Sequence, residues 1–224
     1  MKIKALVAVR SGSIRVENKN LRPFAGSNLI KFKLEQLKRI PELDGIVLNS
    51  NDDTMLAIGK EMGVETVKRD NYYASNSVVM SDVYVNMAQN IDTDIIVYAN
   101  VTNPILQDKT LSQAINFYKE HCGEYDSVNS AHPIKEFLWL DGKPINYDPL
   151  NQPRSQDLPN IMCINFAFSI LPKELMISVR NVVGRKPYLY PIDCFEATDI
   201  DNMLDFEIAE FLYKKYVMQG KSLK

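Results

Sequence analysis

The feature that most constrains the fold is an alternation of short apolar segments with amphipathic segments along the first half of the chain. Residues 3–9 form an apolar run that only Lys4 interrupts, and its continuous apolar centre is typical of a strand covered on both faces. Further strands are predicted at residues 45–49, 64–68 and 94–98. Helices are predicted from near Asn28, after Asp52 or Asp53, at residues 81–89, and in the segment marked by Leu111, Ile115 and Tyr118. This order predicts an α/β protein with a doubly wound, mainly parallel, Rossmann-like sheet.

Length and composition are consistent with one domain, residues 1–224. Hydrophobic residues make up 46% of the chain, which is enough for a sizeable core. The formal net charge of -2 predicts no general affinity for nucleic acid or for a membrane surface. The cysteines are widely spaced and form no metal-binding pair, so reduced thiols are expected. With neither a signal peptide pattern nor a long apolar run, we expect a cytoplasmic protein.

The alternation breaks after residues 127–131, and a hairpin is predicted next. Asp141-Gly142 separates residues 137–140 from residues 143–147, and this dipeptide is a strong hairpin signal. A further strand is predicted at residues 161–170, so residues 133–172 form an inserted hairpin region. The apolar side chains of residues 137–140, including Trp139, exceed what a hairpin can bury alone. We therefore expect a homodimer, the alternative being that Trp139 packs on its own subunit.

The remainder of the chain is predicted to return to the sheet. Residues 188–192 are expected to form a strand, and a helix is predicted from about Asn202 to Met218. Its core stripe is expected to consist of Leu204, Ile208 and Leu212, and Gly220 would cap its end.

Two short motifs can carry chemistry. After the first strand, Gly12 allows close approach of the backbone to a ligand, the amides of residues 11–13 can face an anion, and Arg10 and Lys19 add positive charge. The pattern fits a phosphate site and an ordinary basic connection equally well. Near the other end, the carboxylates of Asp199 and Asp201 can share a Mg²⁺ ion, although such a pair more often caps a helix.

Longer patterns resemble one family. Ala-x-Arg-x-Gly-Ser-x-Arg-x-x-x-Lys-Asn-Leu, at residues 8–21, resembles the nucleotide-binding signature of the acylneuraminate cytidylyltransferases. Members of that family join CTP to a sugar acid and release pyrophosphate. Residues 199–210 resemble the family's Asp-x-Asp-x-x-x-Asp ending, so the resemblance covers both ends of the chain. The loop departs from the family pattern at Ile14 and at Glu17-Asn18.

The resemblance implies roles for the nucleotide side of a site. Arg69 would read the cytosine edge, the alternative being a solvated surface cation. The nucleotide-binding residues would be Ala8, Arg10, Ser11, Gly12, Ser13, Lys19, Asn20, Arg69 and Ser81. The residues that carry catalysis would be Arg10, Lys19, Asp199 and Asp201. The magnesium ligands would be Asp199 and Asp201, whereas Asp205 would be a structural helix residue.

The resemblance also implies an acceptor side, where this chain departs most from the family. The expected substrate-binding residues are Asn100, Thr102, Lys135, Arg154, Gln156 and Asn165, although for Lys135 a plain surface role is equally open. Sialate enzymes have glutamine in place of Asn100, arginine in place of Leu106 and Cys163, and glycine in place of Phe166. Because cysteine cannot clamp a carboxylate as arginine does, N-acetylneuraminic acid is expected to be a poor substrate. The acceptor is then another acidic sugar or acidic small molecule, and His132 is expected only to shape the turn before Pro133.

The implied reaction is attack of an acceptor hydroxyl on the α-phosphorus of CTP, for surface glycan biosynthesis, with Asp199 as the favoured base. Two alternatives remain open: a glycosyltransferase that uses the Asp-x-Asp motif, and an inactive nucleotide-binding relative. A dinucleotide-binding oxidoreductase is disfavoured because no G-x-G-x-x-G follows the first strand.

Overall fold

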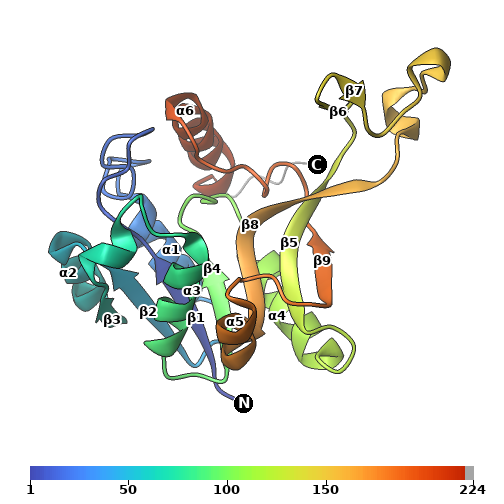
Figure 1. Ribbon diagram of the computed structural model, residues 1–224. Coiled ribbons are helices and arrows are strands. Elements are labelled where there is room, and N and C mark those ends of the chain that lie inside the picture. Colours follow the sequence, from blue (N-terminus) through green and yellow to red (C-terminus); the bar gives the residue numbers. More distant parts are fainter. Residues whose placement is uncertain (220–224) are drawn as a thin grey trace.

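A seven-stranded sheet forms the centre of the molecule (Figure 1), which we describe from a computed structural model for residues 1–219. Its strand order is β3-β2-β1-β4-β8-β5-β9. Only β8 runs antiparallel to its neighbours β4 and β5, so the predicted mainly parallel α/β sheet is confirmed. The strands are β1 (Ile3–Ala8), β2 (Gly45–Ser50), β3 (Glu65–Lys68), β4 (Ile95–Ala99), β5 (Ser127–Ile134), β8 (Ile161–Pro172) and β9 (Pro187–Pro191).

Helices cover both faces of the sheet. The side chain of Asn28 accepts a hydrogen bond at the start of the first helix, and Asp52 does the same for the second, as expected for N-cap residues. The fifth helix, at residues 173–179, was not predicted. The helices are α1 (Leu29–Lys38), α2 (Asp53–Glu61), α3 (Met80–Gln89), α4 (Asp108–His121), α5 (Lys173–Val179) and α6 (Met203–Leu212), with shorter turns η1 (Asn71–Ala74), η2 (Pro149–Asn151), η3 (Ser155–Asp157) and η4 (Tyr213–Val217).

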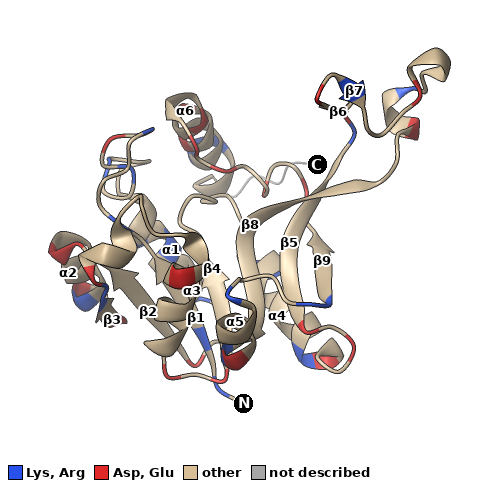
Figure 2. Ribbon diagram, viewed as in Figure 1, with Lys and Arg blue, Asp and Glu red and all other residues tan. Residues whose placement is uncertain are grey.

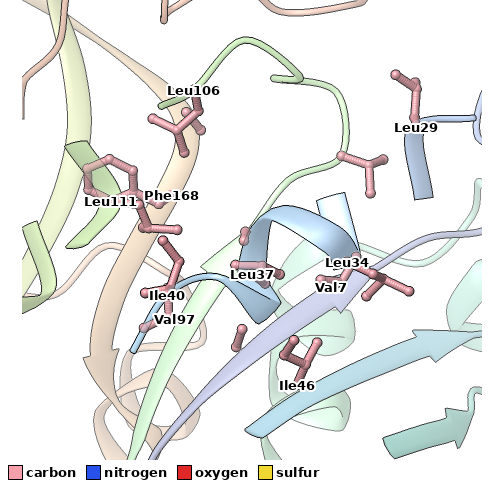
Figure 3. Close-up of a cluster of buried hydrophobic side chains, with 14 of the residues drawn as sticks. Val7, Leu29, Leu34, Leu37, Ile40, Ile46, Val97, Leu106, Leu111 and Phe168 are labelled. Carbon is pink, nitrogen blue, oxygen red and sulfur yellow. The ribbon is translucent and has the colours of Figure 1, made fainter. Parts of the chain in front are cut away.

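The apolar side chains of the strands are buried in two hydrophobic cores, one on each face of the sheet. Successive residues of a strand point to opposite faces, so Ala5 and Val7 enter one core and Leu6 enters the other. The larger core lies under α1, α4 and α6 and includes Leu37 and Phe168 (Figure 3). The smaller core lies under α3 and α5. In Figure 2 the central strands β4 and β8 carry no charged residue, as expected for strands buried on both faces.

The predicted core stripe of α6 is wrong. Leu204 is 64% exposed and Ile208 is 45% exposed, whereas Phe206 and Ala209 are buried. The helix begins at Met203 with a capping box formed by Asn202 and Asp205, and Phe206 and Ala209 pack in the larger core. The outer face of α6 therefore carries an apolar stripe made of Leu204, Ile208 and Phe211. Gly220, the predicted cap, lies outside the described residues.

Residues 135–160 form an arm that projects from the sheet between β5 and β8 (Figure 1). It holds the predicted hairpin, with β6 (Trp139–Leu140) and β7 (Lys143–Pro144) joined by Asp141 and Gly142, both at positive φ, as a type I′ turn requires. Trp139 is 56% exposed although its indole donates to the Tyr147 hydroxyl. The role of residues 133–172 in dimerisation stays a prediction.

Within residues 1–219, no helix combines the length and the apolar character that crossing a bilayer requires.

Candidate active site

A pocket of about 410 Å³, here named the loop pocket, opens at the carboxyl end of β1. The loop after β1 turns at Gly12, whose φ of 80° favours glycine. The Ser11 amide donates to Asn51 Oδ1 at 3.2 Å. Because this amide is already bonded, the amides of Gly12 and Ser13 remain as donors for the predicted anion site. The lining residues that matter below are Arg10, Ser13, Arg15, Lys19, Asn20, Asn100 and Thr102.

Lys19 joins this loop to the far end of the chain. Its Nζ donates to the carbonyl oxygen of Ile200 at 2.7 Å. Burial lowers the pKa of Lys19, although the nearby charges of Asp199 and Asp201 act in the opposite direction. Arg15 adds an ion pair with Asp201, with Nη2 and Oδ1 2.8 Å apart. The segment of the Asp-x-Asp motif therefore contacts Lys19 and Arg15, two residues that line the loop pocket.

The two carboxylates of the Asp-x-Asp motif lie in different surroundings. Asp199 is exposed at the surface, but partial loss of solvent raises the pKa of its carboxyl; the charge of Asp201 acts in the same direction, and a hydrogen bond from Thr102 opposes it. Asp201 is also exposed, and it forms the ion pair with Arg15. The Asp205 side chain accepts from the amides of Asp201 and Asn202 at 3.0 and 2.9 Å, which is the structural role expected for it.

A second pocket of about 330 Å³, here named the Arg69 pocket, adjoins the loop pocket, with Ala8, Val9 and Arg10 lining both. Arg69 is only 5% exposed, so it is not a solvated surface cation. Its guanidinium donates to the carbonyl oxygen of Val9, and its buried Nε has no partner within residues 1–219. Tyr98 lines the same pocket.

Arg10 and Asn20 fix the walls of these pockets. The Arg10 guanidinium donates to the Ala74 carbonyl oxygen at 2.6 Å and to Asn76 Oδ1 at 2.7 Å, so it bridges the two pockets and points toward η1. Asn20 is buried, and its Nδ2 donates to the Arg10 carbonyl oxygen at 3.1 Å. Arg10 therefore lies beside both pockets, and Asn20 holds the loop in shape.

The acceptor side begins where β4 and β8 meet. Asn100 Nδ2 donates to the Phe166 carbonyl oxygen at 2.9 Å. Asn165 accepts from Ser130 Oγ at 2.6 Å, and its Nδ2 lies 3.4 Å from His132 Nδ1. Phe166 has a φ of 55°, a left-handed conformation that favours glycine.

Comparison with known proteins shows the family of this chain. Residues 4–141 match the family described as Cytidylyltransferase. The chain belongs to the cytidylyltransferase family. The predicted resemblance to acylneuraminate cytidylyltransferases is thereby confirmed at the level of the family.

Several relatives carry names that fit this family. An N-acylneuraminate cytidylyltransferase of Oncorhynchus mykiss is 27% identical over 93% of this chain and 49% of its own length. A pseudaminic acid cytidylyltransferase of Campylobacter jejuni strain 81-176 is 24% identical over 96% of this chain and 97% of its own length. The chain therefore spans about half the length of the fish relative and nearly all of the bacterial one.

Solved structures share the fold of this cytidylyltransferase. A CMP:2-keto-3-deoxy-manno-octonic acid synthetase complexed with CTP superposes with a TM-score of 0.71 at 12% identity, covering 96% of this chain and 99% of its own. A 4-diphosphocytidyl-2C-methyl-D-erythritolsynthase from Anaerococcus prevotii has a TM-score of 0.70 at 13% identity, covering 97% of this chain and 96% of its own. At these identities the likeness concerns the fold alone.

The predicted acceptor residues of this cytidylyltransferase divide into two groups. Asn100 and Thr102 line the loop pocket. Asn165 precedes Phe166, whose carbonyl oxygen accepts a hydrogen bond from Asn100. In contrast, Lys135 donates to the Leu158 carbonyl oxygen and to Asn160 within the arm, at 2.6 and 2.8 Å.

The other predicted residues on the arm are also bonded locally. Arg154 pairs with Asp157 at 2.8 Å, and Gln156 is exposed in η3. The arm residues Lys135, Arg154 and Gln156 are therefore not brought to the pocket of their own chain. Ser81 also lies outside both pocket linings, where Met80 and Val83 of α3 stand instead.

Three contributors were not predicted. Arg15 pairs with Asp201, although it formed part of the loop motif and was given no role. Tyr98 belongs to an apolar strand segment, where a tyrosine is normally expected to be a core residue, so no role in a site was predicted for it. Asn51, which holds Ser11, follows β2, and only the pairing of β2 with β1 reveals its place.

The donor set fits a magnesium ion. Within residues 1–219 no group of three or more His, Cys, Asp or Glu side chains could hold a metal. Asp199 and Asp201 supply two oxygen donors, and their mutual repulsion contributes to the raised pKa of Asp199, which a cation between them would relieve. Magnesium commonly takes one or two carboxylates together with substrate phosphates and water, so a pair is sufficient.

Proposed function

We propose that this chain is a CTP-dependent cytidylyltransferase that transfers CMP to an acidic sugar or related acidic acceptor for surface glycan biosynthesis. The observation that carries the proposal is the junction of the two motifs, where Lys19 bonds the Ile200 carbonyl oxygen beside Asp199 and Asp201. This junction adjoins a closed pocket with a buried, incompletely bonded arginine. The names of the relatives, which act on N-acylneuraminate and on pseudaminic acid, support the same reaction.

The Arg69 pocket is the proposed cytosine site. A pyrimidine edge needs donors and acceptors that are fixed before binding, and Arg69 is held by Val9 and Met87. Its Nε still lacks a partner, so a bound base could satisfy a donor that is otherwise left unbonded. The Tyr98 hydroxyl offers a second polar group to the same pocket. The nucleotide phosphates would then extend past Arg10 into the loop pocket.

The chemistry follows from the groups around the loop pocket. The acceptor oxygen forms a bond to the α-phosphorus, the bond from that phosphorus to the bridging oxygen breaks, and pyrophosphate leaves. Asp199 takes the proton of the attacking hydroxyl through a bridging water. Lys19 and Arg10 stabilise the negative charge on the phosphates. When bound by Asp199 and Asp201, magnesium would add positive charge beside those phosphates.

The acceptor is proposed to be an acidic molecule other than N-acetylneuraminic acid. Cys163 pairs with His132 across β8 and β5, beside Asn165, where sialate enzymes are expected to have an arginine. No arginine of the described residues stands there in its place, because Arg154 is bonded within the arm. The recognition of an acidic group is therefore left to residues of another subunit or to neutral donors.

We also propose a homodimer in which the arm of one subunit packs on α6 of the other. The arm exposes Trp139 and Leu140, and the outer face of α6 exposes Leu204, Ile208 and Phe211. Two apolar surfaces without a partner in their own chain can cover each other in a symmetric dimer. Because α6 starts directly after Asp201, such packing would carry the partner's arm toward the loop pocket.

Measurement of pyrophosphate release tests the function. CTP is incubated with N-acetylneuraminic, legionaminic or pseudaminic acid, with Kdo, or with simpler acidic acceptors, in the presence of magnesium. One acidic acceptor is expected to give turnover with CTP, with UTP and ATP much poorer and chelation of magnesium abolishing it. Absence of release with every acceptor would favour an inactive relative, and transfer from a nucleotide sugar instead would favour a glycosyltransferase.

A further inference from the structure

A separate pocket of about 400 Å³, here named the rear pocket, lies between α1, the segment of residues 104–108 and the turn η4. None of its lining residues lines the loop pocket or the Arg69 pocket. Its polar floor is formed by Lys33 and Gln36 of α1, and its walls include the rings of Phe32, Phe195 and Tyr216. The proposed cytidylyl transfer uses none of these residues.

The floor of the rear pocket holds a buried cation. Lys33 is 2% exposed, and its Nζ donates to Gln36 Oε1 at 2.7 Å and to the Asn103 carbonyl oxygen at 3.2 Å. An ammonium group has three N–H donors, so these two bonds leave one for another acceptor. No carboxylate pairs with Lys33 within residues 1–219. Burial of a charge without an opposite charge is unfavourable, and a lysine that merely packed here would be replaced by an apolar residue at lower cost.

The acidic residue nearest to Lys33 is already engaged. Asp108 lines the rear pocket, but both of its oxygens accept from Arg39, from Nε at 2.6 Å and from Nη2 at 3.1 Å. A two-pronged pair of this kind leaves little of the carboxylate to neutralise another cation. Lys33 is therefore the unneutralised charge of the pocket.

The walls indicate what else a ligand must carry. Phe32 stacks at a tilt with Tyr213, their ring centres 4.7 Å apart, and Phe195 meets Tyr216 edge to face at 5.4 Å. Such a wall favours an apolar or aromatic body. We propose that the rear pocket binds a small amphipathic acid, with its carboxylate on Lys33 and its apolar body against these rings.

Because Lys33 is buried, the affinity of the rear pocket for an acid is expected to depend on pH. Burial lowers the pKa of Lys33 to about 7, and Asp108 opposes the shift only in part. Arg39, Asp108, Tyr213 and Tyr216 are the other titratable groups lining the pocket; burial raises the pKa of Tyr213 to about 12. A bound carboxylate favours the charged ammonium, so binding takes up a proton at and above neutral pH. The affinity for an acid is therefore expected to fall as the pH rises above about 7.

Titration calorimetry with 4-phenylbutyrate and its neutral amide, 4-phenylbutanamide, tests the site. The acid is expected to bind at least about tenfold more tightly than the amide at pH of about 6.5, since a charge-assisted bond is worth that much. Proton uptake, measured in two buffers of different ionisation enthalpy, should accompany binding at pH of about 8. Saturating CTP should leave the affinity unchanged because the pockets share no residue.

Variants of two lysines on the same helix provide the control. Lys33→Met should bind the acid and the amide equally and take up no proton, whereas Lys31→Met, which alters the lysine paired with Glu61 at the surface, should behave as wild type. Equal binding of acid and amide by the wild-type protein, or displacement of the acid by CTP, would overturn the proposal. So would failure of the acid to bind, and each of these outcomes is independent of whether cytidylyl transfer is found.

Discussion

The sheet with its helices, here named the body, and the arm of residues 135–160 differ in how their charged and apolar residues are placed. In the body, Lys19, Arg10 and Arg69 are bonded to atoms far away in the sequence, and the apolar residues of the strands are buried. In the arm, Lys135 and Arg154 bond only to atoms of the arm itself, and Trp139 and Leu140 remain exposed. The arm is also the part of the chain that leaves the sheet (Figure 1).

This difference divides the proposed function between two parts. The Arg69 pocket and the loop pocket are lined by residues of the body alone, so we infer that binding of CTP needs one chain. The arm presents polar side chains predicted for the acceptor, at a distance from its own pocket, and an apolar surface that needs cover. We infer that binding of the acceptor, unlike binding of CTP, depends on a second chain. The predictions below test this division, beginning with the largest expected effect.

Replacement of Asp199 by asparagine should abolish the chemistry of the body. We expect kcat to fall by about 10²- to 10⁴-fold, as for loss of a general base, with CTP still bound. The folded state raises the pKa of Asp199, so its charge opposes folding at neutral pH, and its favourable contribution exists only at low pH. Asp199→Asn should therefore melt at a higher temperature at pH of about 7, with the gain vanishing below the unfolded pKa of about 3.9.

The neighbouring Asp205→Asn provides the control for Asp199→Asn. Its carboxylate closes the capping box of α6, so this change should cost about 1 kcal/mol of stability and keep most of the turnover. A normal rate in Asp199→Asn would show that its carboxylate only shapes the loop.

The sequence predicted the body well because its signals are local. Continuous apolar runs gave β1, β2 and β4, and Asn28 and Asp52 marked helix starts that the side chains do cap. The face of α6 was predicted wrongly because leucine and isoleucine at helical spacing normally face a core. Here Phe206 packs against Phe24 in the core instead, which leaves Leu204, Ile208 and Phe211 as an apolar outer stripe.

The candidate site was predictable only where a motif names its residues. The loop and the Asp-x-Asp motif each named candidate side chains, but the contact between the two motifs across 181 positions, from Lys19 to Ile200, is a property of the folded sheet. Lys33 was not predicted, because a lysine in an amphipathic helix is normally solvated. Its burial depends on the segment of residues 103–106 that covers it.

Disruption of the arm should separate binding of the acceptor from binding of CTP. A lysine in place of Trp139 or of Ile208 places a charge in the proposed contact, and we expect about 30-fold weaker dimerisation or more. Sedimentation velocity would measure the dimer, and KM for the acceptor should rise while Kd for CTP stays constant. Glu120→Lys, an exposed change on α4 outside both surfaces, serves as the control.

A monomeric wild-type protein at micromolar concentration would contradict the dimer. Equal losses of CTP and acceptor affinity in the Trp139 and Ile208 variants would contradict the division between body and arm.

Replacement of Cys163 by arginine should make binding of an acidic acceptor less dependent on the arm. N-acetylneuraminic acid is expected to be a poor substrate of the wild-type protein. Cys163→Arg should raise its kcat/KM by about ten- to a hundredfold, since a charged hydrogen bond to a carboxylate contributes about 1.5–3 kcal/mol. Cys122→Arg, at the exposed end of α4, adds the same charge elsewhere and should have no effect. Efficient use of N-acetylneuraminic acid by the wild type would refute the argument from the missing arginine.

The smallest effect is expected at Phe166, where the strand from the arm enters the body. Its φ of 55° costs a residue with a side chain about 1–2 kcal/mol, and its ring, 37% exposed, recovers little of that by burial. Phe166→Ala removes the ring but keeps the strain, whereas Phe166→Gly removes both. Glycine should therefore be more stable than alanine here by about 0.5–1 kcal/mol, the reverse of the usual order within regular elements.

Denaturant unfolding of the two Phe166 variants would measure this difference directly. The carbonyl oxygen of Phe166 accepts from Asn100, so the left-handed conformation places a backbone acceptor beside the proposed acceptor site. If glycine is the more stable variant and yet turns over more slowly, the ring itself contacts the acceptor, and the boundary between body and arm lies within the site. If alanine is the more stable, the strain at this junction is relieved by contacts of the neighbouring strands, and the junction belongs wholly to the body.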